Sequence, residues 1–194
     1  MANVETKNWS LLPVATSLNG KSKAAPISAG GQRVSFALPP TKAPFGANSY
    51  DPLEKVRMNL DLSCTDQYTA FLEKVDKWAV EQLSKDPSKY FKQAKTPAEV
   101  KAAYRKCATP HEKPDGQKYP DTMRLKIMLE GPSKIRCWTP DHQPRDIPTD
   151  FRNCVITPFV SAKSIWLMGG NSAGILWECS DCIVEEEDIS CLFT

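Results

Sequence analysis

The fold of this chain is decided by Thr122-Met-Arg-Leu-Lys-Ile-Met-Leu-Glu130, Gly131-Pro-Ser133 and Lys134-Ile-Arg-Cys-Trp138. Apolar and basic residues alternate in both arms, which is the period of a half-buried strand. The Gly-Pro-Ser segment between the arms indicates a turn. The stretch therefore predicts a β-hairpin with one apolar face and one basic face. The basic face would carry four cations and one indole, which are Arg124, Lys126, Lys134, Arg136 and Trp138.

Two interpretations of this basic face remain open. Like charges opposite one another across two strands are destabilising. The face is therefore either splayed into solvent or neutralised by an anionic partner. Residues 101–136 carry nine basic residues against four acidic ones. Such a patch, interleaved with aromatic residues, is typical of nucleic-acid binders and also occurs in proteins that bind none.

The rest of the chain predicts more strands and one helical region. Residues 56–62 alternate as an amphipathic strand, and residues 33–38 are strand-like. Apolar residues then recur at helical spacing from Tyr68 to Leu83, after Ser63 or Thr65 as the N-cap. A second helix begins at Thr96-Pro-Ala-Glu99, which has the pattern of a capping box. The C-terminal third predicts strands over 153–160, 164–168 and 173–184.

The sum is a mainly β (α+β), predominantly antiparallel domain with helices inserted between the second and third strands. The chain has 194 residues, of which 41% are hydrophobic and 25% are charged, enough for one sizeable core. We expect an irregular N-terminal arm over 1–32 and one domain over 33–184, with a helical insertion over 63–109. Residues 185–194 form an acidic, then apolar, C-terminal tail.

Composition narrows the class of protein. No run of eighteen apolar residues and no secretory signal are present, which predicts an intracellular protein that is not secreted. Seven cysteines, an odd number, fit free thiols in a reducing compartment. Removing the four acids of the run 185–188 from the total of 23 leaves 25 basic residues against 19 acidic ones. The body of the chain is therefore basic and the tail acidic.

Signs of catalysis are few. Both histidines, His111 and His142, lie in polar loops flanked by prolines, and no phosphate-binding Gly-x-x-x-x-Gly-Lys motif occurs. Cys179-Ser-Asp-Cys182 has the spacing of half a zinc site, but no second pair of ligands completes it. Positions three apart in a regular strand also point to opposite faces. We expect no enzyme, no catalytic residues, no metal and no cofactor.

The C-terminal third carries a resemblance. Its motifs are Asp150-Phe-Arg-Asn-Cys-Val-Ile-Thr-Pro-Phe159, Ser164-Ile-Trp166, Gly169-Gly170 and the strand that starts Gly174-Ile-Leu-Trp177. Together with the arm 134–138, they resemble the end of an OB-fold single-stranded DNA-binding protein of phage or large DNA virus type. The resemblance covers roughly residues 120–194. It implies an OB-fold-like antiparallel β-barrel that binds single strands during replication, repair or recombination, and it is compatible with the nucleus or a viral replication site.

The groove of such a barrel combines cations that follow the phosphates with aromatic side chains that stack on bases. We expect the four cations of the basic face to bind phosphates and Trp138 to stack. Phe159, Lys163 and Trp166 are further candidates on neighbouring strands. For Phe159 and Trp166 the alternative is packing in the core.

The tail resembles the acidic tips through which single-strand binders recruit replication proteins. The residues concerned are Glu185, Glu186, Glu187, Asp188, Ile189, Leu192 and Phe193. The alternative is a last strand with a solubilising end.

Two other functions share these features. One is a non-enzymatic scaffold or interaction subunit of a larger assembly, and the other is an RNA-binding OB module.

Overall fold

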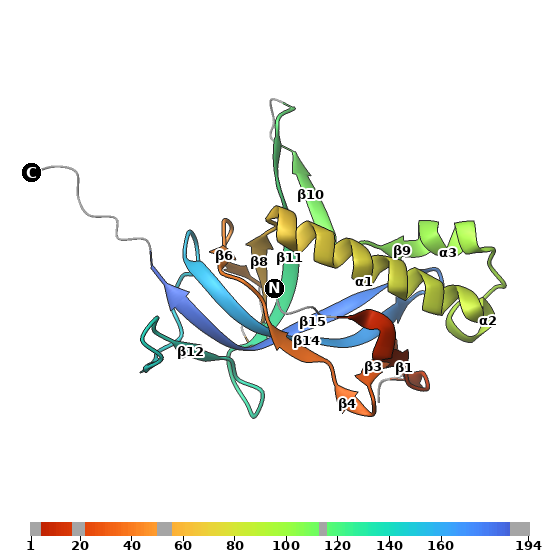
Figure 1. Cartoon of the computed structure of the whole chain (residues 1–194), viewed down its shortest axis with the longest axis horizontal. Coiled ribbons are helices and arrows are strands. Elements are labelled where there is room, and N and C mark those ends of the chain that lie inside the picture. Colours follow the sequence, from red (N-terminus) through yellow and green to blue (C-terminus); the bar gives the residue numbers. More distant parts are fainter. Residues whose placement is uncertain (1–4, 17–21, 50–55, 113–115, 187–194) are drawn as a thin grey trace, which may run out of the picture.

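Two long strands form the centre of the computed structural model, which describes residues 5–16, 22–49, 56–112 and 116–186. β14 (Val155–Met168) and β15 (Ser172–Glu185) pair antiparallel over most of their length. Figure 1 shows them crossing the molecule side by side. A turn over 169–171 joins them, and Gly169 and Gly170 adopt positive φ of 60° and 75°, which suits glycine.

Shorter strands pair with the outer edges of β14 and β15. The edge of β14 carries, in order, β6 (Thr41–Lys42), β5 (Ser35–Ala37) and β3 (Lys23–Ala29). The edge of β15 carries β12 (Arg136–Trp138), β11 (Lys118–Met128) and β9 (Tyr104–Arg105), all parallel to it. The mainly β, predominantly antiparallel class is confirmed, and the three contacts with β15 are parallel.

The remaining elements complete and curl the sheet. They are η1 (Thr6–Asn8), β1 (Trp9–Leu11), β2 (Ala15–Thr16), β4 (Gln32–Arg33), β7 (Ala47–Asn48), β8 (Arg57–Ser63), β10 (Ala108–Glu112) and β13 (Pro144–Arg145). β8 pairs antiparallel with β11, as the alternation over 56–62 requires. The Thr41 hydroxyl donates to the Ser63 carbonyl at 2.7 Å. This bond joins β6 to β8, so two distant parts of the sheet meet as in a partly open barrel.

The predicted hairpin over 122–138 is wrong, although its alternation is right. Met123, Leu125 and Ile127 are fully buried, whereas Arg124 is exposed. β11 pairs with β8, β10 and β15, and β12 pairs with β13 and β15, but no register joins β11 to β12. The loop between the arms is closed by the backbone N–H of Ile135, which donates to the carbonyl of Met128 at 2.8 Å. Beyond this contact the second arm forms no ladder with β11, and both arms pair parallel with β15 instead.

The expectation of an irregular arm over 1–32 is also wrong for the described residues. β3 pairs with β14 over residues 23–26, and β1 pairs with β3. Composition hides this strand, because Ala24, Ala25 and Pro26 have low strand propensity. The exposed edge of β14 supplies the hydrogen bonds that local propensity does not.

The helices lie between β8 and β9, as expected. They are α1 (Asp66–Lys85), α2 (Pro87–Tyr90) and α3 (Pro97–Ala103). Of the two expected caps for α1 it is Thr65 that accepts from the backbone N–H of Tyr68, and α3 begins with the predicted capping box of Thr96 and Glu99. Among the described residues no helix is long and apolar enough to cross a membrane.

The core lies between α1 and the inner face of the sheet. Trp177 of β15 is 2% exposed, and its ring lies 6.0 Å from that of Phe71 on α1. Trp9 and Trp78 are also buried, with ring centroids 5.3 Å apart. The six cysteines in the described residues are free thiols, five of them buried, and Cys191 lies outside the described residues.

Candidate nucleic-acid interface

The outer face of the sheet, turned away from the core, brings most of the predicted binding residues together. Residues opposite one another on neighbouring strands share a face. Arg136 is opposite Asp181, and Asp181 is opposite Phe159, so these three side chains form one row across β12, β15 and β14. Trp138 follows Arg136 by two residues and lies on the same face.

The aromatic candidates in this part of the face are accessible. Phe159 is 41% exposed, which settles the choice against core packing. Trp138 is partly buried, and its indole N–H donates to Asp181 at 3.3 Å. Arg136 forms an ion pair with the same carboxylate at 2.7 Å. Burial opposes ionisation of Asp181, but the hydrogen bonds from Arg136, Ser180 and Trp138 prevail and lower its pKa.

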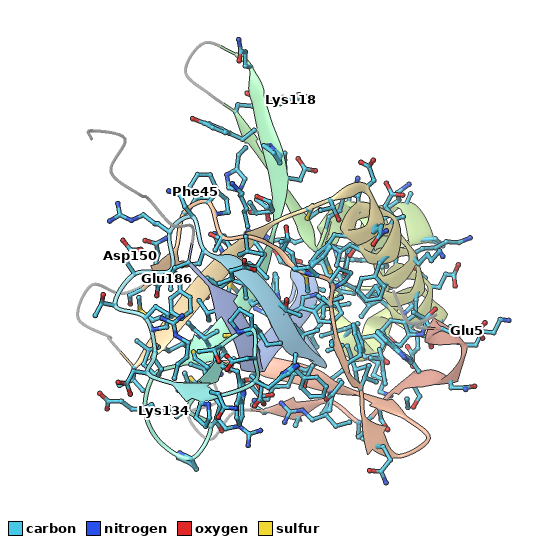
Figure 2. All side chains as sticks on the ribbon, turned by 60° about the vertical axis from the view of Figure 1, so that its left-hand side comes forward. Glu5, Phe45, Lys118, Lys134, Asp150 and Glu186 are labelled. Carbon is cyan, nitrogen blue, oxygen red and sulfur yellow. The ribbon has the colours of Figure 1, made fainter. Side chains whose placement is uncertain are left out.

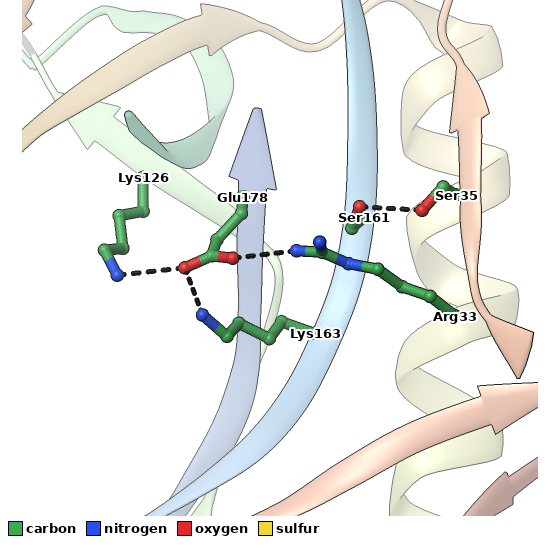
Figure 3. Close-up of polar contacts among 6 residues, drawn as sticks. All are labelled: Arg33, Ser35, Lys126, Ser161, Lys163 and Glu178. Atoms are coloured by element: carbon green, nitrogen blue, oxygen red, sulfur yellow. Dashed lines mark hydrogen bonds and ion pairs between the residues drawn. The ribbon is translucent and has the colours of Figure 1, made fainter. Parts of the chain in front are cut away.

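A second row lies on the same face, centred on Glu178. The register places Lys126 of β11 opposite Glu178 of β15. Oε1 of Glu178 accepts from Lys126 at 2.9 Å and from Lys163 at 2.7 Å, and Oε2 accepts from Arg33 at 2.9 Å. Figure 3 shows the three cations converging on this carboxylate from different strands. Burial again opposes the charge, but hydrogen bonds from the two lysines lower the pKa of Glu178.

Two β-bulges aim these side chains outward. The register of β14 and β15 shifts after Phe159, so Ser180 is an extra residue in β15, and both Glu178 and Asp181 lie on the outer face. The same bulge leaves Cys179 and Cys182 both buried, which corrects the expectation that they lie on opposite faces. The second shift, between Ala162 and Ser164, places Lys163 at an exposed bulge position.

Lys134 completes the basic face. It is exposed, and no ion pair of Lys134 exists among the described residues. It lines a cavity of about 320 Å³ together with Arg33, Lys126, Arg136 and Glu178. Figure 2 shows Lys134 on the same side of the molecule as Glu186 and opposite Glu5. The cavity is therefore a concave, cation-rich part of the outer face.

Trp166 lies at the far end of the same face. It is opposite Gly174 of β15, which is opposite Arg105 of β9. Its indole covers Gly174 so closely that a Cβ there would lie 2.5 Å from the ring. Trp166 is partly exposed and Arg105 is exposed, so this end also offers a ring beside a cation.

Arg124 also has a structural contact that the sequence did not predict. Its guanidinium forms a bidentate ion pair with Asp61 of β8, in which Nε donates to Oδ1 at 2.8 Å and Nη2 donates to Oδ2 at 3.1 Å. The side chain of Asp61 is only 8% exposed, whereas that of Arg124 is 54% exposed. Arg124 therefore neutralises a buried carboxylate, in addition to any contact with a ligand.

We expect Arg124→Ala to lower the free energy of unfolding by about 1–3 kcal/mol, because the buried carboxylate of Asp61 would lose both hydrogen bonds from the guanidinium. Urea unfolding measures this loss. Lys134→Ala is the matched control, since Lys134 has no such partner, and it should change stability by less than about 0.5 kcal/mol. Equal stabilities of the two variants would contradict the role of Arg124.

Only the start of the tail can be placed. Glu185 ends β15, as the alternative of a last strand requires, and Glu186 forms an ion pair with Arg145. Glu187, Asp188, Ile189, Leu192 and Phe193 lie outside the described residues.

Sequence reasoning missed the acidic members of the face and Arg33. Asp61, Glu178 and Asp181 lie 63, 52 and 45 residues from Arg124, Lys126 and Arg136, respectively, and Arg33 lies 145 residues from Glu178. No local pattern carries such pairs. A second missed group is aromatic and lies at the β10–β11 pair, which projects from the body in Figure 1. The ring centroid of Phe45 lies 5.1 Å from that of His111 and 6.2 Å from that of Tyr119.

Comparison with known proteins gives matches among solved structures alone. No family model and no curated protein matches the chain. The structure of gp2.5, a single-stranded DNA-binding protein encoded by bacteriophage T7, is 11% identical, with a TM-score of 0.44, over 78% of this chain and 91% of that one. The single-stranded DNA-binding protein of bacteriophage Enc34 in complex with single-stranded DNA is 10% identical, with a TM-score of 0.42, over 92% of this chain and 97% of that one. Both are similarities of fold at low sequence identity.

Proposed function

We propose that the chain binds single-stranded DNA on the outer face of its sheet, with little dependence on base sequence, and acts by binding without chemistry. The row of Arg136, Asp181 and Phe159, with Trp138 beside it, carries this proposal, because it places a cation, an exposed phenyl ring and a partly buried indole on one face. Stacking of a base on an aromatic ring contributes about 1–3 kcal/mol and tolerates any base. Lys126, Lys134 and Lys163 lie on the same face, where a phosphate backbone would pass.

The proposed role is to protect or organise single strands during replication, repair or recombination. The acidic tail is proposed to recruit replication proteins, with Glu185 and Glu186 at its start. The mechanism needs no base-specific contact, since phosphates and ring faces are common to every nucleotide.

The test is binding of a fluorescently labelled ~30-residue single strand by anisotropy, beside a duplex and an RNA of the same sequence, over a range of salt concentrations. Tight, salt-dependent preference for single-stranded DNA is expected. Equal binding of RNA would favour the RNA-binding alternative. No binding at low salt would overturn the proposal and leave the scaffold alternative.

We expect the double variant Lys126→Ala/Arg136→Ala to change the salt dependence. Each phosphate contact on a single strand contributes about −0.7 to the slope of log K against log salt, so the slope should become shallower by about 1.4. Affinity at about 50 mM salt should fall roughly tenfold per contact. Lys74→Ala/Lys77→Ala on α1, which removes the same charge from another face, should leave the slope nearly unchanged. An unchanged slope in the first variant would exclude these two cations from the interface.

A further inference from the structure

Glu178 is surrounded by positive charge in a way that a structural carboxylate does not require. Three cations from three different strands donate to its two oxygens within 2.7–2.9 Å. One carboxylate neutralises one of them, so the group keeps a net charge of about +2. The side chain of Glu178 is 16% exposed, and those of Lys163 and Arg33 are 47% and 57% exposed. A ligand can therefore reach the cations from solvent.

The geometry around Glu178 suits a phosphate. Two lysine ammonium groups share one oxygen, while a guanidinium contacts the other. Phosphate oxygens accept several charge-assisted hydrogen bonds of this kind at once. The cavity of about 320 Å³ beside Glu178 also has Lys134 and Arg136 in its wall. The carboxylate thus occupies a position where a backbone phosphate would meet the same donors.

We propose, resting on the proposed function, that Glu178 is a built-in competitor for the phosphates of the bound strand. In the free protein its carboxylate holds Lys126, Lys163 and Arg33. In the complex a phosphate takes over part of these contacts while the negative charge of Glu178 repels it. Glu178 therefore lowers affinity and sets it at a level from which the strand can be released.

The opposite role for Glu178 would be to position the cations. Glutamine keeps the size of the side chain and one carbonyl acceptor, but loses the charge. If Glu178 only positioned the cations, Glu178→Gln would bind equally well or more weakly. If Glu178 competes with phosphate, the same variant binds more tightly, because the charge repulsion disappears and no ion pairs have to be broken when the phosphate binds.

The experiment compares wild type, Glu178→Gln and Glu81→Gln for binding of a labelled ~30-residue oligothymidylate by anisotropy at several salt concentrations. Glu81 is exposed on α1, so its replacement makes the same change in net charge away from the site. We expect Glu178→Gln to bind about 3- to 30-fold more tightly at low salt, from the Coulomb energy of a charge pair about 6 Å apart near the surface. Glu81→Gln should stay within about twofold of wild type, because salt screens the distant charge.

A second measurement tests the same competition through a neighbouring cation. Lys163→Gln should weaken binding more in the Glu178→Gln background than in wild type. In wild type the charge of Lys163 is already partly neutralised by Glu178, so its removal costs less affinity. If wild type binds and Glu178→Gln binds equally or more weakly, the competitor role is overturned while the proposed function stands. If neither wild type nor Glu178→Gln binds at low salt, both proposals are overturned.

Discussion

Replacing Phe159 and Trp138 together with alanine is expected to weaken binding of single-stranded DNA by about 2–6 kcal/mol, the contribution of two stacked bases. Phe159 is 41% exposed on β14, and its position in the register is directly beside that of the Arg136–Asp181 ion pair. Such a ring gains the burial of its open face when a base stacks on it. Since neither aromatic side chain is charged, the slope of log K against log salt should stay as in wild type.

Two controls separate stacking from other effects. Leu12→Ala removes an apolar side chain that is 43% exposed on another part of the surface, and it should leave binding unchanged. Trp138→Phe keeps a ring but removes the N–H that donates to Asp181, so it should retain most of the affinity. Wild-type affinity in the double variant would show that the strand does not follow this row, whereas a shallower salt slope would indicate a disturbed position of Arg136.

The largest effect on stability is expected from Trp177→Ala, which should lower the free energy of unfolding by about 3–5 kcal/mol. Trp177 is 2% exposed and packs against the rings of Phe36 and Phe71, at centroid distances of 6.2 Å and 6.0 Å. Its indole N–H also donates to the sulfur of Cys107 at 3.3 Å. Alanine would leave a cavity at the centre of the core that neighbouring rings fill only in part.

Urea unfolding with an unchanged m value measures this loss. Cys107→Ala serves as a control, because it removes the sulfur acceptor but keeps the ring packing, and it should cost clearly less than Trp177→Ala. A loss below about 1 kcal/mol for Trp177→Ala would show that the tryptophan contributes little to core packing, since surface substitutions have effects of that size.

Residue periodicity predicted those elements whose spacing of apolar residues is the same whichever strand or helix they pack against. The buried face of α1 and the alternation in β8 and β11 follow from residue spacing alone. Strand pairing does not, because an alternating segment can pair with any available edge. The segment 134–138 was therefore expected beside β11, although it pairs with β15, and β3 was missed because its residues have weak strand propensity.

The candidate site was predictable in its cations and not in its carboxylates. Arg124, Lys126 and Arg136 stand out because each alternates with buried residues. In the sequence, nothing distinguishes Glu178 and Asp181 from other acidic residues. The bulge at Ser180 places both on the outer face and breaks the period of two on which strand predictions rest. The sequence therefore indicates a basic face, while the structure reveals a face in which most of the named cations already have partners.

The parallel pairing of β9, β11 and β12 with β15 has a consequence for synthesis of the chain. All three strands leave the ribosome before the strand that holds them together. Until β15 has emerged, the helices and the β8–β11 pair exist without the strand that carries Trp177 into their core. Because domains assemble when their long-range contacts become available, this sheet forms late, and the earlier segments expose apolar surface to chaperones in the meantime.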